Sequence, residues 1–400
     1  MTQQTPRPAK ALLLLCAVGF AGFFASYLRI PVLPLLAASL GGNPDQVGAI
    51  NAAFMLSAGL LSIPAGVLAD RAGRRPVLLA GLGLLALSSF LIALSATPLQ
   101  MAAVYLLFGA GLAAFAPTMM SLVADTAPPQ FLGRAYGWYT TAVYTAMTFG
   151  PAAGGFLVRG VGLRGVFLVS GGLLAILGAT AFAVIPRDPS RHDAAPLNRL
   201  PTTILNLLAN RLLAASLLAT FGGCFGFGMF ITFLPLHART HGLDPGQTGL
   251  VFSAQAIVNV FARIPFGRLG DNADNRGVLA AAGFTLIATA TAVIGSCTTT
   301  LALALCGALL GIGMAIGFTA VGAIIAAAVD RQFRALAMGL YNSCIYLGMM
   351  ASSAIMGGVI HAAGYRAGFL AGGGVSAALT ILFVALYRKG TRNETVVSEK

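Results

Sequence analysis

Long apolar stretches alternate with short polar segments along almost the whole chain. A helix needs about 20 apolar residues to cross the roughly 30 Å hydrocarbon core of a bilayer. Twelve stretches of this kind can be counted, at 11–39, 46–69, 77–98, 101–124, 135–158, 166–185, 212–236, 248–269, 278–300, 301–329, 335–360 and 367–387. The pattern therefore predicts an all-α membrane protein with twelve transmembrane helices.

The composition excludes a soluble protein. Of the 400 residues 58% are hydrophobic and only 9% are charged, whereas about 25% are charged in an ordinary soluble domain. So few charges could not cover a soluble surface. The net charge of +13 does not indicate a nucleic-acid partner, because the basic residues are scattered through the short segments between apolar stretches.

The positions of Lys and Arg predict the orientation. With both termini inside, eighteen of these residues fall on the inner side of the membrane and four fall in outer loops. Because Lys and Arg accumulate in short cytoplasmic loops, we expect a multi-pass protein of the inner membrane with both termini in the cytoplasm. The first apolar stretch is too long for a cleaved leader and is expected to remain as a span.

One long polar connection divides the chain. It is rich in proline and charge and lies between the sixth and seventh apolar stretches. We expect a six-helix bundle at 1–186, a cytoplasmic linker at 187–211, a second six-helix bundle at 212–388 and a cytoplasmic tail at 389–400.

The two halves repeat each other in sequence. Phe20, Pro34, Pro44, Gln46 and Gly48 recur 201 positions later as Phe221, Pro235, Pro245, Gln247 and Gly249, and after one inserted residue the register continues to Gly155 and Gly357. Since each half has an even number of spans, both enter the membrane from the same side and form a parallel repeat. Such a fold binds its substrate near the middle of the membrane, between the halves.

The loop from Gly66 to Pro76 contains Gly66, Asp70, Arg71 and Arg74, and a weaker copy contains Gly267, Asp271 and Arg276. In spacing and place the loop resembles the signature of the major facilitator superfamily between its second and third helices. The resemblance implies a gating latch in which Asp70 faces the helix start near Arg334 and Arg74 pairs with Asp125. The alternative is a basic loop that serves orientation only.

The predicted fifth helix carries Gly150-Pro151-Ala152-Ala153-Gly154-Gly155. This stretch resembles the antiporter motif of the drug and metabolite exporters in the superfamily. Glycine and proline at this density are typical of a bent, closely packed helix. The resemblance implies that these residues take part in gating and that the protein works in efflux.

The acidic residues do not support a proton antiporter. All eleven fall in loops or at helix ends, so that no carboxylate is expected at mid-membrane. Where such exporters carry an arginine in the fourth helix, this chain has Tyr105. His237 is the obvious titratable substitute, or else a structural histidine at the membrane interface.

Two arginines lie within the predicted spans, Arg29 and Arg263. A charge at that depth is costly and usually faces a cavity, which makes both candidate substrate contacts. Gln255 and Asn259 precede Arg263 at intervals of four and share its helix face. Further candidates for the cavity wall are Tyr27, Asn51, Tyr139, Asn342 and Tyr346. Alternatively Arg29 snorkels outward, and Arg263 snorkels inward or bonds a broken helix end.

We therefore expect a secondary transporter that exports a drug or metabolite by alternating access and acts as a monomer. A carrier of organic or inorganic anions, using Arg29 and Arg263, is the alternative reading, and a receptor or assembly protein with the same fold is a remote one. The expected partners are a small-molecule substrate and membrane lipids, with a coupling proton or counter-ion left open. The sequence contains no catalytic set, metal cluster or phosphate loop, so neither an enzyme nor a cofactor is expected.

Overall fold

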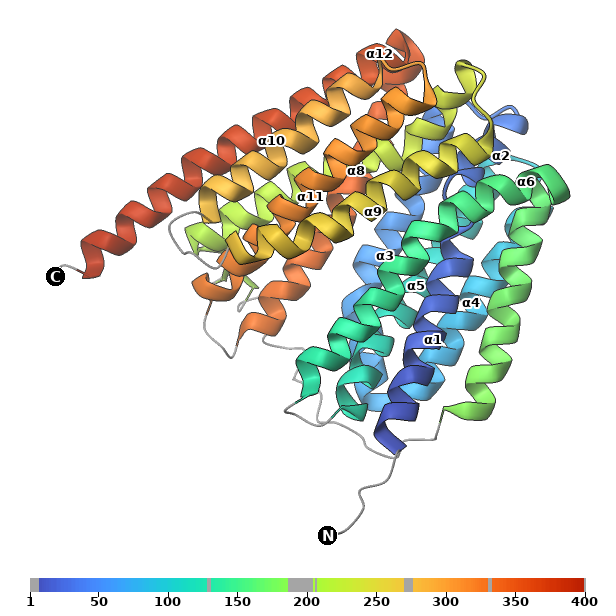
Figure 1. The fold of residues 1–400 in the computed structure, drawn as a ribbon, viewed down its shortest axis with the longest axis horizontal. Helices are drawn as coiled ribbons and strands as arrows, with labels where there is room; N and C mark the ends of the chain where they lie inside the picture. The colour runs from blue at the N-terminus through green and yellow to red at the C-terminus, as the bar shows by residue number, and fades with distance from the viewer. Residues whose placement is uncertain are drawn as a thin grey trace. The chain divides into compact units, whose positions relative to one another are not determined.

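The computed structural model describes residues 7–127, 131–185, 204–205, 207–269, 276–329 and 333–398, and these are helical almost throughout. The helices are α1 (Arg7–Tyr27), α2 (Val32–Ser39), α3 (Pro44–Ala72), α4 (Arg74–Leu94), α5 (Pro98–Thr126), α6 (Leu132–Val184), α8 (Arg211–Thr240), α9 (Pro245–Leu269), α10 (Arg276–Ile294), α11 (Thr300–Ala328) and α12 (Arg334–Ser398) (Figure 1). No strand occurs in this part of the chain. The predicted all-α fold is confirmed.

Local sequence explains where several helices begin. The side chain of Thr97 accepts a hydrogen bond from the backbone amide of Gln100 at the start of α5, and Asn210 accepts bonds from the first amides of α8. Such caps satisfy amides that have no partner inside the helix. Gly73, at φ 94°, precedes α4, a backbone conformation that glycine adopts without steric cost.

The number of membrane crossings stays a prediction. Nine stretches of the described residues are long and apolar enough to cross a membrane. Two of them are unusually long and contain a residue with non-helical dihedral angles, Gly162 in α6 and Gly364 in α12. The predicted first span is likewise interrupted between α1 and α2 by a turn at 28–31.

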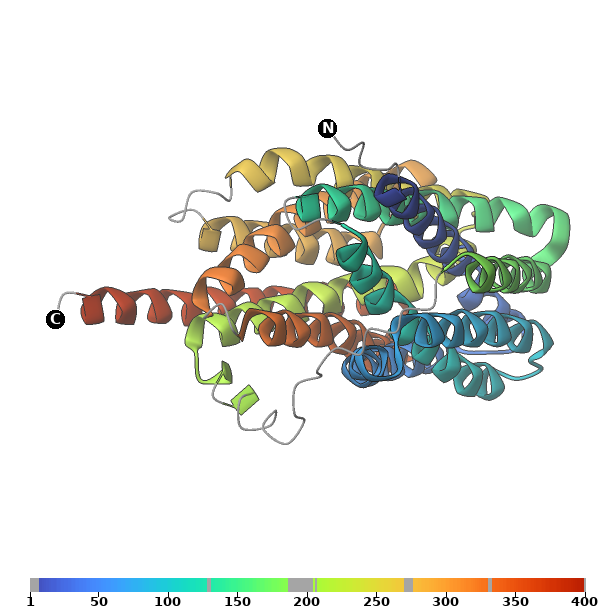
Figure 2. The same ribbon diagram turned by 90° about the horizontal axis from the view of Figure 1, so that it is seen from below.

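The chain forms two compact units. Unit 1 contains the described residues within 1–41, 56–194 and 244–253, and unit 2 contains those within 42–55, 195–243 and 254–400. Within unit 1, α6 packs along α1 and α4, and α4 packs along α5; within unit 2, α8 and α10 pack along α12, and α10 packs along α11 (Figures 1 and 2). The first parts of α3 and α9 therefore each belong to a different unit from the rest of the helix. The domain boundaries expected from the linker stay a prediction.

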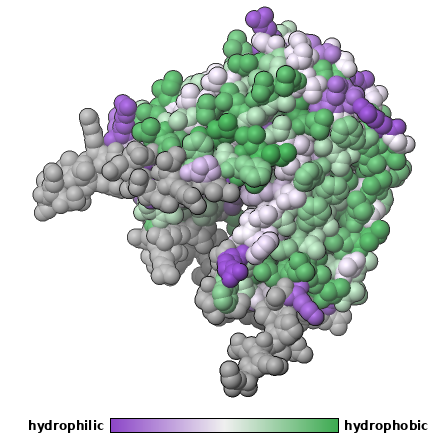
Figure 3. Space-filling view, in the orientation of Figure 1, coloured by the Kyte–Doolittle hydropathy of each residue, from purple (hydrophilic) through white to green (hydrophobic). Residues whose placement is uncertain are grey.

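The exterior is suited to lipid. Large apolar side chains such as Leu60, Trp138, Phe261 and Ile381 are more than half exposed, and hydrophobic residues cover much of the face shown in Figure 3. The interior of unit 2 contains Phe284 and Phe383, both almost fully buried, with the Phe318 ring edge-on to Phe284. A chain that exposes this much apolar surface requires a hydrocarbon environment.

Candidate functional site

Arg29 lies in the turn between α1 and α2 and is completely buried. Its Nε donates a hydrogen bond to the carbonyl of Ser26 at 3.2 Å. The guanidinium carbon lies 3.6 Å from the centre of the Phe108 ring and 5.9 Å from that of Tyr105, both on α5. Two aromatic faces thus provide cation–π contact in a desolvated place. The snorkelling alternative is not what the structure shows.

The ends of this guanidinium remain without a hydrogen-bond partner. Among the described residues, nothing accepts a bond from Nη1 or Nη2 of Arg29, and the Ser26 hydroxyl is also buried and unpartnered. Buried donors are normally paired, because an unpaired one loses its hydration without compensation. Unit 1 therefore holds a buried positive charge with donors available to an anion.

Two predicted tyrosines also lie in unit 1. Tyr139 on α6 is 2% exposed, and its hydroxyl has no partner among the described groups. Its ring packs against Gly19 of α1. Tyr27 is half-buried at the end of α1, with its ring 6.3 Å from that of Phe23. The structure thus places Tyr27 and Arg29 in one segment and Tyr139 on the helix packed against it.

The polar face predicted on α9 is present in unit 2. Arg263 Nε donates to Asn259 Oδ1 at 3.0 Å, and Asn259 Nδ2 donates to the carbonyl of Gly311 at 3.2 Å. Gln255 Nε2 lies 3.3 Å from the sulfur of Met314. This network fixes the side chain of Arg263 from within the unit. In contrast to Arg29, Arg263 is only half-buried.

The remaining predicted substrate contacts in unit 2 differ in their surroundings. Asn51 is buried, and its Nδ2 has no partner within the described part of the chain. Tyr346 is half-buried and meets the edge of the Phe54 ring at 6.5 Å. Asn342 is exposed in the structure. Their roles in binding stay predictions.

The loop that resembles the family signature joins α3 to α4. Arg74 forms an ion pair with Asp125 at the end of α5 and also donates to the carbonyl of Ser121. Side-chain exposure is 11% for Arg74 and 32% for Asp125, so the pair is partly shielded from water. The expected contact is present; its part in gating stays a prediction.

For the other residues of the predicted latch, the described contacts do not identify a role. Asp70 is half-buried and Arg71 exposed in the last turn of α3, and a side chain at Gly66 would meet no described atom within 4 Å. The approach of Asp70 to the helix start at Arg334 concerns two units and stays a prediction. In the second copy, Gly267 lies near the end of α9 and Arg276 begins α10, while Asp271 is outside the described residues.

The glycines of α6 make close backbone contacts. A Cβ atom at Gly150 would lie 2.8 Å from that of Tyr27, and one at Gly154 would overlap the carbonyl of Leu28. On another side of α6, a Cβ at Gly155 would overlap the carbonyl of Pro245, and the carbonyl of Pro151 lies against Gly249. The glycine motif thus packs α6 against both the segment before Arg29 and the first turn of α9.

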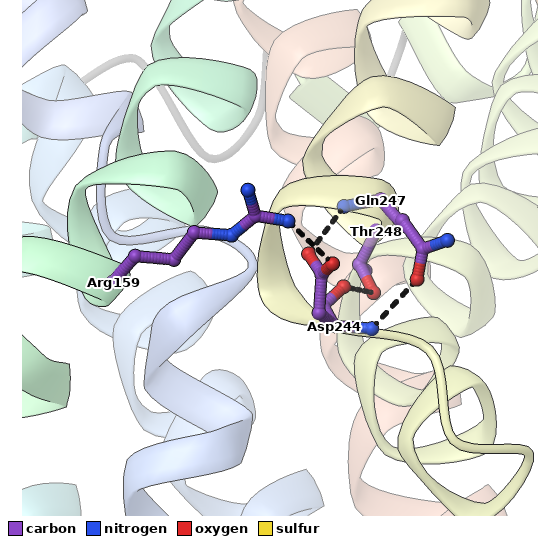
Figure 4. Close-up of polar contacts among 4 residues, drawn as sticks. All are labelled: Arg159, Asp244, Gln247 and Thr248. Carbon is purple, nitrogen blue, oxygen red and sulfur yellow. Dashed lines mark hydrogen bonds and ion pairs between the residues drawn. The ribbon is translucent and has the colours of Figure 1, made fainter.

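A polar cluster at the start of α9 continues this contact. Asp244 Oδ1 accepts a bond from the backbone amide of Gln247 at 3.0 Å, while Gln247 Oε1 accepts one from the amide of Asp244 at 2.9 Å. This is a reciprocal capping box. Asp244 Oδ2 also lies 2.7 Å from Arg159 Nη2 on α6 (Figure 4), so that one carboxylate caps α9 and ties it to α6.

The electrostatics of Asp244 follow from these contacts. Partial burial disfavours the charged carboxylate, but the amides of Gln247 and Gly246 and the Arg159 guanidinium outweigh it and hold the pKa of Asp244 below its ordinary value. The ion pair is therefore formed at neutral pH. We call residues 151–159 of α6 with residues 244–253 the unit 1 junction.

An equivalent arrangement occurs in unit 2. Asn43 and Gln46 form the same reciprocal box at the start of α3, with distances of 2.9 and 3.2 Å. Asp45 Oδ2 lies 2.7 Å from Nδ1 of His361 on α12. We call residues 353–361 of α12 with residues 43–55 the unit 2 junction. Sequence reasoning missed both ion pairs, although the capping boxes are visible in the repeat as Asn43/Gln46 and Asp244/Gln247.

His237, the titratable candidate on α8, is packed inside unit 2, and its role stays a prediction. It is 2% exposed, and its Nε2 lies 2.9 Å from the carbonyl oxygen of Cys297. Its ring packs against His241, Tyr365 and Phe369. Within the described residues, no group of three or more His, Cys, Asp or Glu could hold a metal ion.

The protein is a multi-pass helical membrane protein with a repeated architecture, a buried basic site and close helix junctions. This combination is typical of a membrane carrier. The family model of the Major Facilitator Superfamily matches residues 15–244 and again residues 216–400. The chain belongs to this superfamily. Its members are carriers rather than enzymes.

Relatives and solved structures agree with this assignment. An uncharacterized MFS-type transporter of Methanocaldococcus jannaschii is 23% identical over 82% of this chain and 85% of its own length. The multi-drug resistance efflux pump PmrA of Streptococcus pneumoniae is 29% identical over 64% of this chain and 66% of its own length. The crystal structure of the nucleoside transporter NupG has a TM-score of 0.76 at 17% identity, covering 94% of this chain and 99% of that one, and it shows a shared fold.

Proposed function

We propose that this transporter exports a small organic molecule that carries an anionic group, and that Arg29 holds this group. The observation that carries the proposal is the completely buried guanidinium whose Nη1 and Nη2 have no acceptor among the described residues. A carboxylate or phosphate could accept two parallel hydrogen bonds from it. Its arrival would compensate a charge that the protein otherwise leaves unpaired in a desolvated place.

The charge distribution supports an anion over a cation. In the described helices of unit 1, Asp70 and Asp125 lie in the last turns of α3 and α5, where they do not offset a charge deep in the unit. A lipophilic cation would therefore be repelled by Arg29 without gaining a carboxylate partner. Arg263 supports the same polarity but is already bonded to Asn259, so we assign it the weaker role.

Export as the direction is supported by similarity and by packing. The name of the PmrA relative describes an efflux pump, and the motif at Gly150–Gly155 resembles that of exporters. In this chain the motif joins α6 to the segment just before Arg29 through Gly154. A movement of α6 would thus displace Arg29 directly. Such a movement could expose the site first to one side of the membrane and then to the other.

The test uses purified full-length protein and two probe families, aromatic carboxylates and organophosphates against lipophilic cations. A ligand held at a hundred times its dissociation constant adds about 2.7 kcal/mol to stability, which thermal unfolding detects. We expect stabilisation by anions only, together with counterflow of the stabilising anion in proteoliposomes. Arg29→Gln should abolish both. Arg29→Lys should restore little, because lysine lacks the planar fork.

Arg164→Gln is the matched control in unit 1. Its guanidinium donates to the carbonyls of Ala93 and Ser95 at 2.9 and 3.0 Å, so that its hydrogen-bonding capacity is used within the protein. This variant should keep anion binding even where its stability falls. Stabilisation by lipophilic cations alone, with normal transport by Arg29→Gln, would overturn the proposal.

Removal of Arg29 should also change the stability of the ligand-free protein. Replacing an unpaired buried charge by an apolar residue of similar length removes a desolvation cost. We therefore expect Arg29→Met to unfold at a higher temperature than the wild type although it transports nothing. An ordinary structural arginine would show the opposite sign.

A further inference from the structure

A cavity of about 370 Å³ lies in unit 2 where α8 begins and the apolar part of α12 ends. Its walls are formed by Leu208, Ala209, Arg211, Ala214, Leu386 and Lys389. The two helices pack along each other (Figure 2). None of these residues belongs to the polar face on α9 or to the unit 2 junction, and Arg29 is a residue of unit 1.

Two positive charges share this cavity. Arg211 and Lys389 are exposed, and none of the ion pairs found between described residues involves either of them. Among the described residues that form the walls there is no carboxylate. Like charges in one cavity raise each other's electrostatic energy, and an anion placed between them lowers it. The lining therefore favours a negatively charged occupant.

The cavity also lies at a membrane boundary. One apolar span begins at Arg211 and another ends at Lys389, so that both charges are at the level where hydrocarbon gives way to head groups. Leu208, 41% exposed, and Leu386 line the same space. A basic end beside an aliphatic wall is complementary to an amphipathic ligand and not to a small soluble ion.

A second cavity provides a contrast. In unit 1, a space of about 310 Å³ is lined by Leu79, Leu82, Gly83, Ala86, Leu174, Ala175, Gly178 and Phe182. None of these described wall residues is charged, so they offer apolar contact alone. The charges of the unit 2 cavity are thus not a general property of the crevices between helices in this protein.

We infer that the unit 2 cavity binds the head group of an anionic phospholipid. Arg211 and Lys389 contact the phosphate, and Leu208 and Leu386 contact the adjoining acyl chain. Basic pockets between transmembrane helices are suited to such lipids. This site is independent of the transported molecule and does not rest on the proposed function.

The experiment is native mass spectrometry of the full chain, titrated with phosphatidylglycerol or phosphatidylethanolamine in detergent. A basic residue near a membrane surface contributes about fivefold in affinity for an anionic lipid. We expect the wild type to prefer phosphatidylglycerol, Arg211→Gln and Lys389→Gln each to weaken its binding about fivefold, and the double variant about 30-fold. Arg211→Lys, which keeps the charge, should bind nearly as well as the wild type.

Lys10→Gln is the control, because Lys10 is an exposed basic residue at the boundary of another span. It should bind phosphatidylglycerol normally. Equal loss in this control would show a diffuse surface effect and overturn the site, as would equal binding of the two lipids by the wild type. Displacement of the lipid by millimolar inorganic phosphate would mean that a soluble anion is the occupant. Unchanged unfolding temperatures of Arg211→Gln and Lys389→Gln confirm that binding, not folding, was altered.

Discussion

The two junctions are copies of one arrangement, and they have diverged in their charges. The starts of α3 and α9 are related by the 201-residue repeat, and the facing parts of α6 and α12 by an offset of 202 residues. Gly155 and Gly357 occupy equivalent places, against Pro245 and Pro44 respectively. Arg159 in unit 1 is equivalent to His361 in unit 2, and each is paired with a carboxylate on the facing helix start.

The difference concerns where the carboxylate lies and what it meets. In unit 1 the capping residue Asp244 itself pairs with an arginine, whose charge is permanent. In unit 2 the cap is Asn43, and Asp45, two residues later, pairs with a histidine that is charged only when protonated. The repeat has kept the shape of the helix start and changed the position and the partner of the carboxylate. Packing is thus the common element, and the ion pairs are local additions to it.

The largest expected effect concerns the side of the membrane on which both junctions lie. The distribution of Lys and Arg predicts the outer side. In a chain without its native cysteines, we expect Arg159→Cys and His361→Cys to react with an impermeant thiol reagent in intact cells, since these side chains are 62% and 56% exposed. Cysteines at positions 191 and 397 should react only after permeabilisation. The reverse pattern would place the termini outside.

The second prediction compares the glycines. A methyl group at Gly155 would overlap the Pro245 carbonyl, whereas one at Gly357 would lie 2.8 Å from the Pro44 carbonyl. Overpacking of this kind costs about 1–3 kcal/mol. We expect Gly155→Ala to lower the unfolding temperature more than Gly357→Ala does.

Gly160→Ala is the control for this comparison. It is on the same helix as Gly155, but a side chain there meets no described atom within 4 Å. Alanine should be neutral or stabilising at this position by up to about 1 kcal/mol, from helix propensity. A larger loss at Gly357 than at Gly155 would contradict the proposed difference in closeness.

The third prediction separates the cap from the ion pair in unit 1. Asp244→Ala removes both, whereas Asp244→Asn keeps a capping oxygen. Loss of a cap costs about 1 kcal/mol, and a largely exposed ion pair contributes about 0–1 kcal/mol. Chemical unfolding should therefore rank the alanine variant well below the asparagine variant. Asn43→Ala in unit 2 should lower the free energy of unfolding by about as much as the loss of a cap alone. If it lowers the free energy of unfolding by as much as Asp244→Ala does, the two junctions do not differ in the way proposed.

The smallest effect is the response to pH. The lowered pKa of Asp244 means that its contribution is present above the ordinary range of aspartate and is lost as the pH falls. This contribution should amount to about 0–1 kcal/mol. The difference in stability between wild type and Arg159→Gln should be the same at pH 8 and at pH 5.5, and it should shrink in stronger acid, where Asp244 becomes protonated. A difference that persists unchanged in strong acid would contradict the role of the Asp244 carboxylate.

Several features of the site followed from local sequence. The face that joins Asn259 to Arg263 was predicted from a spacing of four residues and is present as a 3.0 Å hydrogen bond. The depth of Arg29 was predicted from its place in an apolar stretch, and its side chain is fully buried. The pairing of Arg74 on α4 with Asp125 on α5 is also present, but it was implied by family resemblance and not by local sequence. Helical periodicity and hydropathy are properties of neighbouring residues, so they can be read from the chain.

Other features depend on which helices meet. Phe108 and Tyr105 lie beside Arg29 only because α5 passes the turn after α1. The place of Asn342 in the cavity wall stays a prediction, since the face that a polar residue presents depends on packing and not on its own polarity. The number of membrane crossings and the domain boundaries stay predictions. Both depend on how whole helices are arranged and not on the residues of a single turn.

The sequence by itself determined the membrane class, the helical fold and the internal repeat, because each depends on residues within a few turns or on a constant offset. Only the tertiary structure decided that Asp244 meets Arg159, 85 residues away, and that Asp45 meets His361 across 316 residues. Neither pair has a local signature, since an ion pair between distant helices requires only that packing bring two side chains within reach. The close backbone approach at Gly155 and Gly357 provides that packing, and the charges then differ freely between the two copies.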